Sequence, residues 1–478
     1  MNVASPKRKI EVDHLEVVLN GRLMGRVEHS SGGRLRFVYD DLWRRDPRSV
    51  PLSLSMPLTT ARHEHDRITP FLRGLLPDNE EVLRSWGRRY HASPRNAFAL
   101  LAHVGEDCAG AVQLVRPERL EQVLSSDSWD VEWVDEDEIE RRLARLSRDI
   151  SAWQARSEFG QFSLAGTQPK IALLWENDRW GVPSGRAPTT HILKPPLSGF
   201  DGHVENEFFC LELARELGLP AARSHVQRFG SRVAIIVERF DRVRPAKLAA
   251  AARAKAATAP SSDEARDAVK RARALSALAQ ETPILRLHQE DMCQALGVDP
   301  NSKYQNEGGP GARDLAELLR RHSSQPAQDV WTFIESLIFN WLIGGTDGHA
   351  KNYSILHGNR GRVRLAPLYD LASALAYDDM NPQRLRLAMK VGSKYRLRDI
   401  SARQWAKLGH ELRLNADELQ SRLEGAAARL PEVMDTVRER MRAAGLDHPI
   451  IERLAMRLVD RARACRRSLC AWPSRLER

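Results

Sequence analysis

Short runs of alternating apolar and polar residues open the chain. Between residues 10 and 60, runs such as LEVVLNGRLMGRVE and LRFVYD are separated by glycine and asparagine, which is typical of small antiparallel strands joined by turns. Residues 70–105 change to the spacing of amphipathic helices, and residues 109–115 return to a strand pattern. We therefore predict a small α+β subdomain over residues 1–118.

The pattern in the rest of the chain predicts a second, larger α+β unit. Residues 119–155 are charged and rich in helix-forming residues, so we expect a connecting helix there. Strand patterns joined by tight turns begin at residue 159 and surround one amphipathic helix at 206–220. Helices dominate from residue 312 onward. The predicted second domain, residues 156–478, thus has a strand-rich first lobe and a largely helical C-terminal lobe.

One stretch of the second domain differs in character. Residues 245–283 are rich in alanine and arginine and contain almost no large apolar side chains. Alanine and arginine favour helix, but such a segment has too little apolar surface to form a core. We predict a partly helical, exposed insertion.

Composition narrows the class of protein. The 478 residues correspond to roughly two to four domains, and 42% hydrophobic with 28% charged residues exclude a wholly disordered or fibrous chain. The net charge of +10 favours acidic partners such as nucleic acid or nucleotides, although it is spread over a long chain. Five cysteines without a C-x-x-C pair favour a reducing, cytoplasmic location. We find neither a signal-peptide pattern nor a long apolar run, and expect no membrane contact.

The segment WLIGGTDGHAKNYSIL (341–356) carries the strongest chemical signal. It places Asp347 and Asn352 five residues apart, between an apolar helix and a strand, and Asp370 follows in LAPLYDLAS. Phosphoryl transfer needs a carboxylate that orients and deprotonates the acceptor hydroxyl, and an amide oxygen with a second carboxylate that hold Mg²⁺. The D-x-x-x-x-N spacing matches the catalytic loop of protein kinases. Lys351, beside Asn352, offers a positive charge to the transferring group.

These three residues also have an ordinary structural explanation. Asp347 and the following glycine would form a turn, Asn352 would be solvated and Asp370 would cap a helix. That explanation suits each residue alone. It accounts less well for all three together, flanked on both sides by apolar segments.

A nucleotide needs a cation at its phosphates. Lys194 ends the apolar strand in HILKPP, and Glu207 in the next helix is positioned to pair with it; a lysine that faces solvent is the alternative. The segment FSLAGTQPKIA (162–172) reads as strand, turn and strand with Gly166 at the turn, where backbone N–H groups would meet an anion or simply close a hairpin. VERFDR (237–242) follows a buried strand and offers backbone contacts to an adenine.

The histidines and the C-terminal arginines are two further candidates for binding residues. The histidines lack metal-ligand spacing, so we expect no zinc site. Arg453, Arg457 and Arg461 lie four residues apart near the C-terminus and would share a helix face. A phosphate-contacting stripe and a solvated helix end both remain open for them.

Many blocks of the chain, in order, resemble the HipA family, the serine/threonine-protein kinase toxins of bacterial type II toxin–antitoxin systems. The resemblance spans nearly the whole chain apart from the insertion at 245–283. It rests on the blocks PLSLSMPL, LLPDNEEVLRSWGRRYHA, DCAGAVQL, TTHILKPP, VENEFFCLELARELGL, VERFDR, RLHQEDMCQALG, KYQNEGGPG, WLIGGTDGHAKNYS and PLYDLASA.

The resemblance implies a distant protein-kinase-like fold with ATP between two lobes. It makes Asp347 the catalytic base and assigns Asn352 and Asp370 to Mg²⁺. Lys194 becomes the phosphate-binding lysine. The implied nucleotide contacts are Thr167, Gln168, Lys170, Lys194, Glu238, Arg239, Phe240, His349, Lys351 and Asn352.

The resemblance also implies a biological role. The protein would phosphorylate a translation component such as an aminoacyl-tRNA synthetase, glutamyl-tRNA synthetase by family likeness, and so arrest growth. Its partner would be a HipB-like helix-turn-helix antitoxin, and the complex would bind and repress operator DNA. Two alternatives stay open: a weakly active or inactive nucleotide-binding corepressor, and a kinase that acts on a small molecule or lipid.

One departure from the family concerns self-inactivation. Members of the well-known type carry a phosphorylatable serine in a sequence like S-I-S-G-A-Q, whereas Ala165 occupies the matching position here. Catalysis should survive, because the predicted base and metal ligands remain. Ser163 or Thr167 is a hypothetical substitute acceptor.

Overall fold

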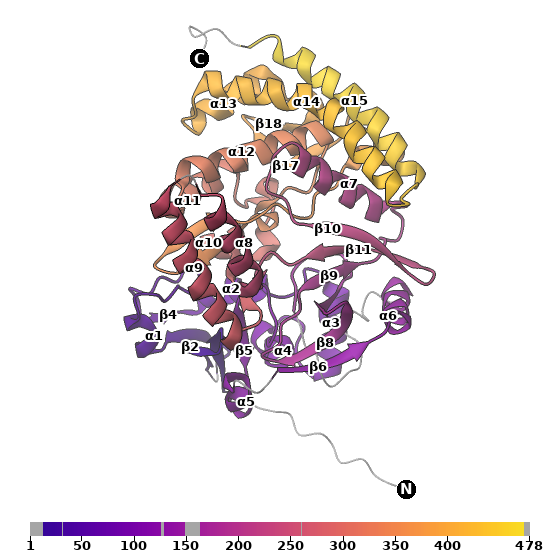
Figure 1. Cartoon of the computed structure of the whole chain (residues 1–478). Coiled ribbons are helices and arrows are strands. Elements are labelled where there is room, and N and C mark those ends of the chain that lie inside the picture. Colours follow the sequence, from indigo (N-terminus) through magenta and orange to yellow (C-terminus); the bar gives the residue numbers. More distant parts are fainter. Residues whose placement is uncertain (1–12, 31, 126–128, 149–162, 260, 473–478) are drawn as a thin grey trace.

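A computed structural model describes residues 13–30, 32–125, 129–148, 163–259 and 261–472 (Figure 1). The chain begins with an antiparallel sheet in the order β4-β3-β2-β1-β5. Helices then pack on this sheet. The bounds are β1 (His14–Leu19), β2 (Arg22–His29), β3 (Leu35–Tyr39), α1 (Asp41–Arg45), β4 (Arg62–His63), α2 (His65–Gly74), α3 (Glu80–Tyr90), α4 (Ala97–Val104) and β5 (Val112–Val115).

The segment predicted as one connecting helix is more varied. It contains α5 (Leu120–Leu124), β6 (Trp129–Val134) and α6 (Glu136–Arg148), so the prediction is wrong in its middle part. In β6, tryptophan and valine alternate with charged residues, a pattern that suits a half-exposed edge strand paired with β8. The dense acidic residues that follow belong to α6 and obscured this strand in the sequence. Residues 149–155 lie outside the described ranges.

The first lobe of the second domain is built on an antiparallel six-stranded sheet. Its order is β10-β11-β9-β7-β8-β6, and α7 (His203–Glu216) packs beside β10 and β11. The predicted strand before Gly166 is absent from described residues 163–170, which form a loop instead. That loop is held by a bridge between Gly166 and Pro77 rather than by a hairpin partner. The strand bounds are β7 (Ile171–Glu176), β8 (Arg179–Gly185), β9 (His191–Lys194), β10 (Ser224–Phe229) and β11 (Arg232–Glu238).

The N-terminal subdomain and the first lobe share one hydrophobic core. Phe37 and Leu101 of the subdomain belong to the same buried cluster as Leu173, Leu193 and Ile236 of the six-stranded sheet. The helical lobe has a separate core around α12 and α14. Because burial of each large apolar side chain stabilises by roughly 1.5–3 kcal/mol, the shared core fixes the N-terminal subdomain against the first lobe.

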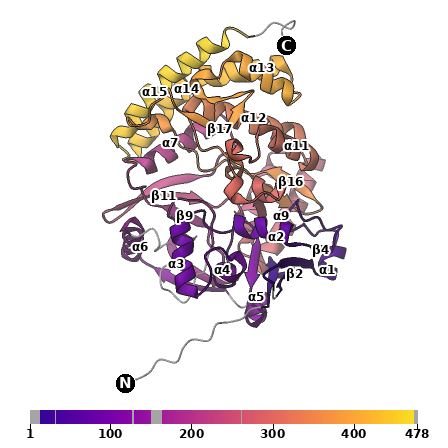
Figure 2. The ribbon, with the colours of Figure 1, turned by 180° about the vertical axis from the view of Figure 1, so that it is seen from behind.

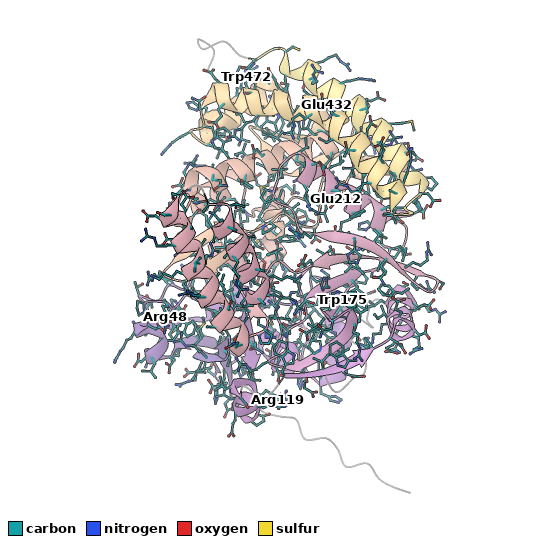
Figure 3. The ribbon with its side chains drawn as sticks, viewed as in Figure 1. Arg48, Arg119, Trp175, Glu212, Glu432 and Trp472 are labelled. Atoms are coloured by element: carbon teal, nitrogen blue, oxygen red, sulfur yellow. The ribbon has the colours of Figure 1, made fainter. Side chains whose placement is uncertain are left out.

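The C-terminal lobe is largely helical, as predicted, and lies at the opposite end from the N-terminal strands (Figure 2). Glu212 of α7 (Figure 3) joins the lobes through an ion pair with Arg440 of α14 at 2.8 Å. The elements are β14 (His288–Asp291), α10 (Met292–Leu296), α11 (Ala312–His322), α12 (Pro326–Ile343), β15 (Ser354–Gly358), β16 (Arg362–Leu365), β17 (Arg386–Val391), β18 (Lys394–Arg396), α13 (Ala402–Glu411), α14 (Ala416–Ala443) and α15 (Pro449–Leu469).

The predicted insertion is exposed, but it is more helical than expected. It forms two helices, α8 (Pro245–Ala257) and α9 (Ser262–Glu281), which pack on each other. Their buried positions are mainly small residues, such as Ala249 on α8 and Ala272 on α9. Alanines let two helices approach closely, so a segment with few large apolar residues, of which Leu248 and Val269 are exposed, still pairs with itself. The strands β12 (Arg242–Val243) and β13 (Leu285–Arg286) close its base.

The C-terminal arginines face the protein rather than an open surface. Arg457 donates to the carbonyl of Leu375 (2.7 Å) and pairs with Asp378, which Arg453 also contacts. Arg461 donates to the carbonyl of Trp341 (3.1 Å). These contacts weaken the idea of a phosphate-binding stripe. No helix in the described part of the chain is long and apolar enough to cross a bilayer.

Candidate active site

A pocket of about 360 Å³ lies where the six-stranded sheet meets the helical lobe. It also receives Gly74 and Asp78 from the N-terminal subdomain. Every residue predicted for the site lines this one pocket: Thr167, Gln168, Lys170, Lys194, Glu238, Arg239, Phe240, Asp347, His349, Lys351, Asn352 and Asp370. Segments far apart in sequence therefore converge as the motifs predicted.

Lys194 is buried at the end of β9 and bridges two carboxylates. Its ammonium donates to Glu207 on α7 at 2.7 Å and to Asp370. Burial alone would lower the pKa of Lys194, but the charges of Asp370 and Glu207 outweigh it and hold that pKa above its ordinary value. The lysine is therefore charged at neutral pH. The solvent-facing alternative is wrong for this residue.

Asp370 sits in a backbone conformation that few side chains adopt. Its φ of 52° lies in the left-handed region, which aspartate tolerates better than most residues. Burial would raise the pKa of its carboxyl, yet Lys194 and Lys170 keep that pKa below its usual range. Asp370 is accordingly an ionised carboxylate beside a buried lysine.

The catalytic-loop motif begins where α12 ends. Gly344 ends the helix with φ of 66°, and a side chain there would collide with Leu375. Asp347 is largely exposed, and the Tyr304 hydroxyl donates to its Oδ1 at 2.7 Å. The Asn352 amide donates to the backbone carbonyl of Asp347 at 2.8 Å, which holds the two motif residues together and leaves the Asn352 carbonyl oxygen as an acceptor.

His349 lies inside the same loop as a neutral imidazole. Burial lowers its pKa to about 4, well below the ordinary value of 6.5. Its Nε2 is 3.8 Å from Asp347 Oδ1, and its buried Nδ1 has no hydrogen-bond partner among the described residues. An imidazole that resists protonation suits the predicted role near the phosphates better than that of a base.

Lys351 points away from the position that its motif suggested. Its buried amine donates to the carbonyl of Gly74 at 3.0 Å and lies 3.4 Å from Asp78 and 3.6 Å from Asp291. Lys303 pairs with the same Asp78 at 2.8 Å. Sequence reasoning missed this network, because its members are distant in sequence and none belongs to a recognisable motif.

Arg239 likewise turns its side chain away from the pocket. Its guanidinium is buried against Asp241 at 2.8 Å and lies 3.6 Å from Asp107 of the N-terminal subdomain. Only its backbone is available to a ligand. This agrees with the expectation that Glu238 to Phe240 offer backbone contacts, and the Phe240 ring lies 5.8 Å from that of Tyr369.

The loop at Gly166 is tied to the N-terminal subdomain. The Asp78 N–H donates to the Gly166 carbonyl at 3.0 Å, and the buried Ser163 hydroxyl donates to the Leu75 carbonyl at 2.8 Å. Lys170 donates to the Ala165 carbonyl at 2.6 Å, and burial lowers its pKa to about 8. Of the two hypothetical substitute acceptors, Ser163 is buried in this arrangement.

The oxygen atoms at Asn352 and Asp370 fit a magnesium ion. Mg²⁺ prefers oxygen ligands and commonly takes only one or two from protein, the rest coming from phosphates and water. An amide carbonyl and an ionised carboxylate supply such a pair. Among the residues that the structure describes, no group of three or more His, Cys, Asp or Glu is arranged to hold a metal.

Comparison with known proteins agrees with this geometry. The HipA N-terminal domain family matches residues 15–115, and the HipA-like C-terminal domain family matches residues 162–441. A Sinorhizobium fredii protein named "Putative kinase Y4mE" is 34% identical over 95% of this chain and 99% of its own length. The serine/threonine-protein kinase toxin HipA of Shewanella oneidensis is 28% identical over 84% of this chain and 83% of its own.

A solved structure extends the likeness to three dimensions. The Shewanella oneidensis complex of HipA, HipB and operator DNA contains a chain that matches with a TM-score of 0.76 at 25% identity, over 96% of this chain and 99% of that one. Two family matches, a relative above 30% identity along nearly the whole length and a shared kinase-like fold agree with one another. The chain belongs to the HipA family of kinase toxins.

Proposed function

We propose that this chain is a Mg²⁺- and ATP-dependent kinase that phosphorylates serine or threonine hydroxyls of a protein substrate. The observation that carries the proposal is the convergence of Lys194, Asp347, Asn352 and Asp370 on one pocket. These groups are the cation, base and metal ligands that phosphoryl transfer requires.

Each residue has a definite task in this reaction. Asp347, exposed at the pocket, orients the acceptor hydroxyl and accepts its proton. Lys194, charged and held by Glu207, places a positive charge against the phosphates. Bound Mg²⁺ would neutralise phosphate charge, with Asn352 and Asp370 as its protein ligands. Such fixed charges lower the barrier because they need no rearrangement during the reaction.

The biological proposal follows the relatives. The solved Shewanella structure contains HipA with HipB and operator DNA, and we propose an equivalent antitoxin partner and operator complex for this chain. The proposed substrate is a translation component such as an aminoacyl-tRNA synthetase, whose phosphorylation arrests growth. This proposal places the protein in the cytoplasm.

Labelled ATP added to a bacterial lysate with the purified protein tests the enzymatic proposal. We expect one labelled protein band with wild type and with Asp137→Asn, which removes an exposed carboxylate on α6, but none with Asp347→Asn. Phosphoamino-acid analysis of the band should give phosphoserine or phosphothreonine. Equal labelling by Asp347→Asn contradicts the proposal. Nucleotide binding without transfer supports the alternative of a nucleotide-binding corepressor. A labelled small molecule supports the alternative of a kinase that acts on a small molecule or lipid.

A further inference from the structure

The hairpin of β17 and β18 is the most one-sidedly charged segment near the pocket. From residue 380 to residue 398 the chain has no aspartate or glutamate, and its basic residues are Arg384, Arg386, Lys390, Lys394, Arg396 and Arg398. Arg386 and Lys390 are exposed on β17, while Leu387 and Met389 between them are buried. Ala388 is buried as well, so the two cations stand in solvent on either side of a buried stretch of the strand.

These cations are not neutralised within the described chain. Arg398 contacts Asp399 at 3.5 Å, but Arg384, Arg386, Lys390 and Lys394 form no ion pair with any described acidic residue. The arginines of α15 differ from these cations in having acidic partners: Arg457, for example, pairs with Asp378. Unpaired like charges on one hairpin repel each other, and this cost is removed when an anionic partner binds.

The hairpin adjoins the predicted catalytic base. The backbone N–H of Lys390 donates to Gln305 Oε1 at 2.8 Å, and the neighbouring Tyr304 donates to Asp347 at 2.7 Å. The hairpin turn is fixed from behind, because a side chain at Gly392 would lie 2.7 Å from the carbonyl of Gln404 on α13. The hairpin is therefore bonded to the short segment that also contacts the carboxylate proposed to receive the acceptor proton.

We propose that the basic face of β17 and β18, formed by Arg384, Arg386, Lys390 and Lys394, is a docking site for an acidic segment of the protein substrate. The inference rests on the proposed kinase function and specifies the chemistry of its substrate. Opposite charges raise the rate of encounter and fix the register of the bound segment. The face would select substrates with aspartate or glutamate near the phosphorylated residue.

A protein segment fits this face better than nucleic acid. Single-stranded nucleic acid is bound by exposed aromatic side chains interleaved with cations, and the one aromatic residue of the hairpin, Tyr395, is half-buried. Duplex DNA is read by an element that enters a groove, whereas this hairpin is seated against α13 and the loop at Gln305. Its place beside Asp347 favours a molecule that delivers a hydroxyl.

The test compares the full-length protein with two triple variants. Arg386→Gln/Lys390→Gln/Lys394→Gln removes three exposed charges of the docking face, and Arg266→Gln/Lys270→Gln/Arg273→Gln removes three exposed charges of α9 as a matched control. The probes are a fluorescent 20-residue serine peptide rich in glutamate, the same peptide with glutamine in place of glutamate, and a 20-base-pair DNA duplex. Binding is measured by fluorescence anisotropy at low and at physiological salt.

We expect wild type and the α9 variant to bind the acidic peptide more tightly than the glutamine peptide, with affinity that falls as salt rises. The docking-face variant should lose about tenfold or more in affinity for the acidic peptide. Equal binding of the two peptides, or an undiminished affinity in the docking-face variant, overturns the inference. The inference is also overturned if wild type prefers the DNA duplex to the acidic peptide and only the docking-face variant loses that preference. The binding measurement does not depend on catalysis. If wild type binds the acidic peptide but transfers no phosphate, the kinase proposal fails and the proposed docking face stands.

Discussion

Two buried lysines beside the same pocket, Lys194 and Lys351, have partners of different kinds. Lys194 bridges Glu207 and Asp370, and Asp370 is one of the two proposed magnesium ligands. Lys351 reaches Gly74, Asp78 and Asp291, which join the catalytic loop to the N-terminal subdomain. A motif predicted a nucleotide contact for both. Their partners differ: Lys194 contacts a carboxylate proposed to bind magnesium, whereas Lys351 contacts the N-terminal subdomain.

The difference shows what the N-terminal subdomain contributes. Asp78 pairs with both Lys351 and Lys303, and its own N–H holds the Gly166 loop. One short segment of the subdomain therefore supports two walls of the pocket. Losing Lys194 should abolish chemistry, whereas losing Lys351 should loosen the junction of subdomain and catalytic loop.

The largest expected effect is that of Lys194→Met on phosphate transfer. Removing a charge aimed at the reacting group costs about 10²–10³-fold in rate, so transfer from labelled ATP should nearly vanish. Lys270→Met, which removes an exposed lysine on α9 outside the pocket and the docking face, serves as the control for loss of a lysine. Transfer within threefold of wild type in Lys194→Met would erase the distinction between the two lysines.

Lys351→Met should act first on stability. It removes the Lys351 cation from buried Asp291 and from Asp78, which keeps its pair with Lys303, and removing one partner of a buried ion pair costs about 3 kcal/mol. Urea unfolding followed by tryptophan fluorescence measures the free energy of unfolding, again with Lys270→Met for comparison. A loss below about 0.5 kcal/mol would show that Lys351 contributes little to the junction.

His349 predicts a pH dependence within the catalytic loop. Its folded pKa of about 4 lies below its ordinary 6.5, so the unfolded chain binds the proton more readily. The stability from the neutral imidazole is complete above pH 6.5 and decreases as the pH falls toward 4. Between pH 7 and 5, wild type should lose roughly 1–2 kcal/mol more than His349→Asn. His410→Asn, which changes an exposed histidine, is the control and should lose as much stability as wild type. If His349→Asn also loses as much stability as wild type between pH 7 and 5, the neutral state assigned to His349 is contradicted.

Tyr304→Phe should have the smallest effect. It removes one hydrogen bond to Asp347, worth about 0.5–1.5 kcal/mol, and should lower kcat about three- to tenfold while leaving the affinity for ATP unchanged. Tyr90→Phe, outside the pocket, is the matched control. If Tyr304→Phe changes the affinity for ATP and leaves kcat unchanged, Tyr304 acts on the nucleotide and not on the acceptor hydroxyl.

Much of the site could be predicted from sequence, for a physical reason. Asp347 and Asn352 lie in one short loop whose spacing is itself the signal, and Lys194 is the last residue of the strand β9, which fixes its position. The direction in which a side chain points could not be predicted as well from the sequence. Lys351 and Arg239 lie in the right segments, but their amine and guanidinium turn toward Asp78 and Asp241, which no local pattern connects with them.

The fold shows the same division between local and long-range information. Sequence patterns located α7, the hairpin of β10 and β11, and the helical lobe. The amphipathic character predicted for α7 is wrong, because every residue from Val204 to Ala214 is buried. The patterns missed β6, an edge strand with little apolar burial, and they imposed a strand on residues 163–165, whose apolar Leu164 packs in a core without a ladder partner. The errors at β6 and at residues 163–165 occur where a distant segment decides the backbone conformation.

The central claim is that Asn352, Asp370 and Lys194 meet at one metal-bound triphosphate. A crystal structure of the protein with a nonhydrolysable ATP analogue and Mn²⁺, with anomalous diffraction at the manganese edge, tests it most directly. We predict an anomalous peak within coordination distance of the Asn352 carbonyl oxygen and the Asp370 carboxylate, with the Lys194 ammonium on the phosphates. A manganese peak elsewhere, or a triphosphate out of reach of Lys194, would contradict the account.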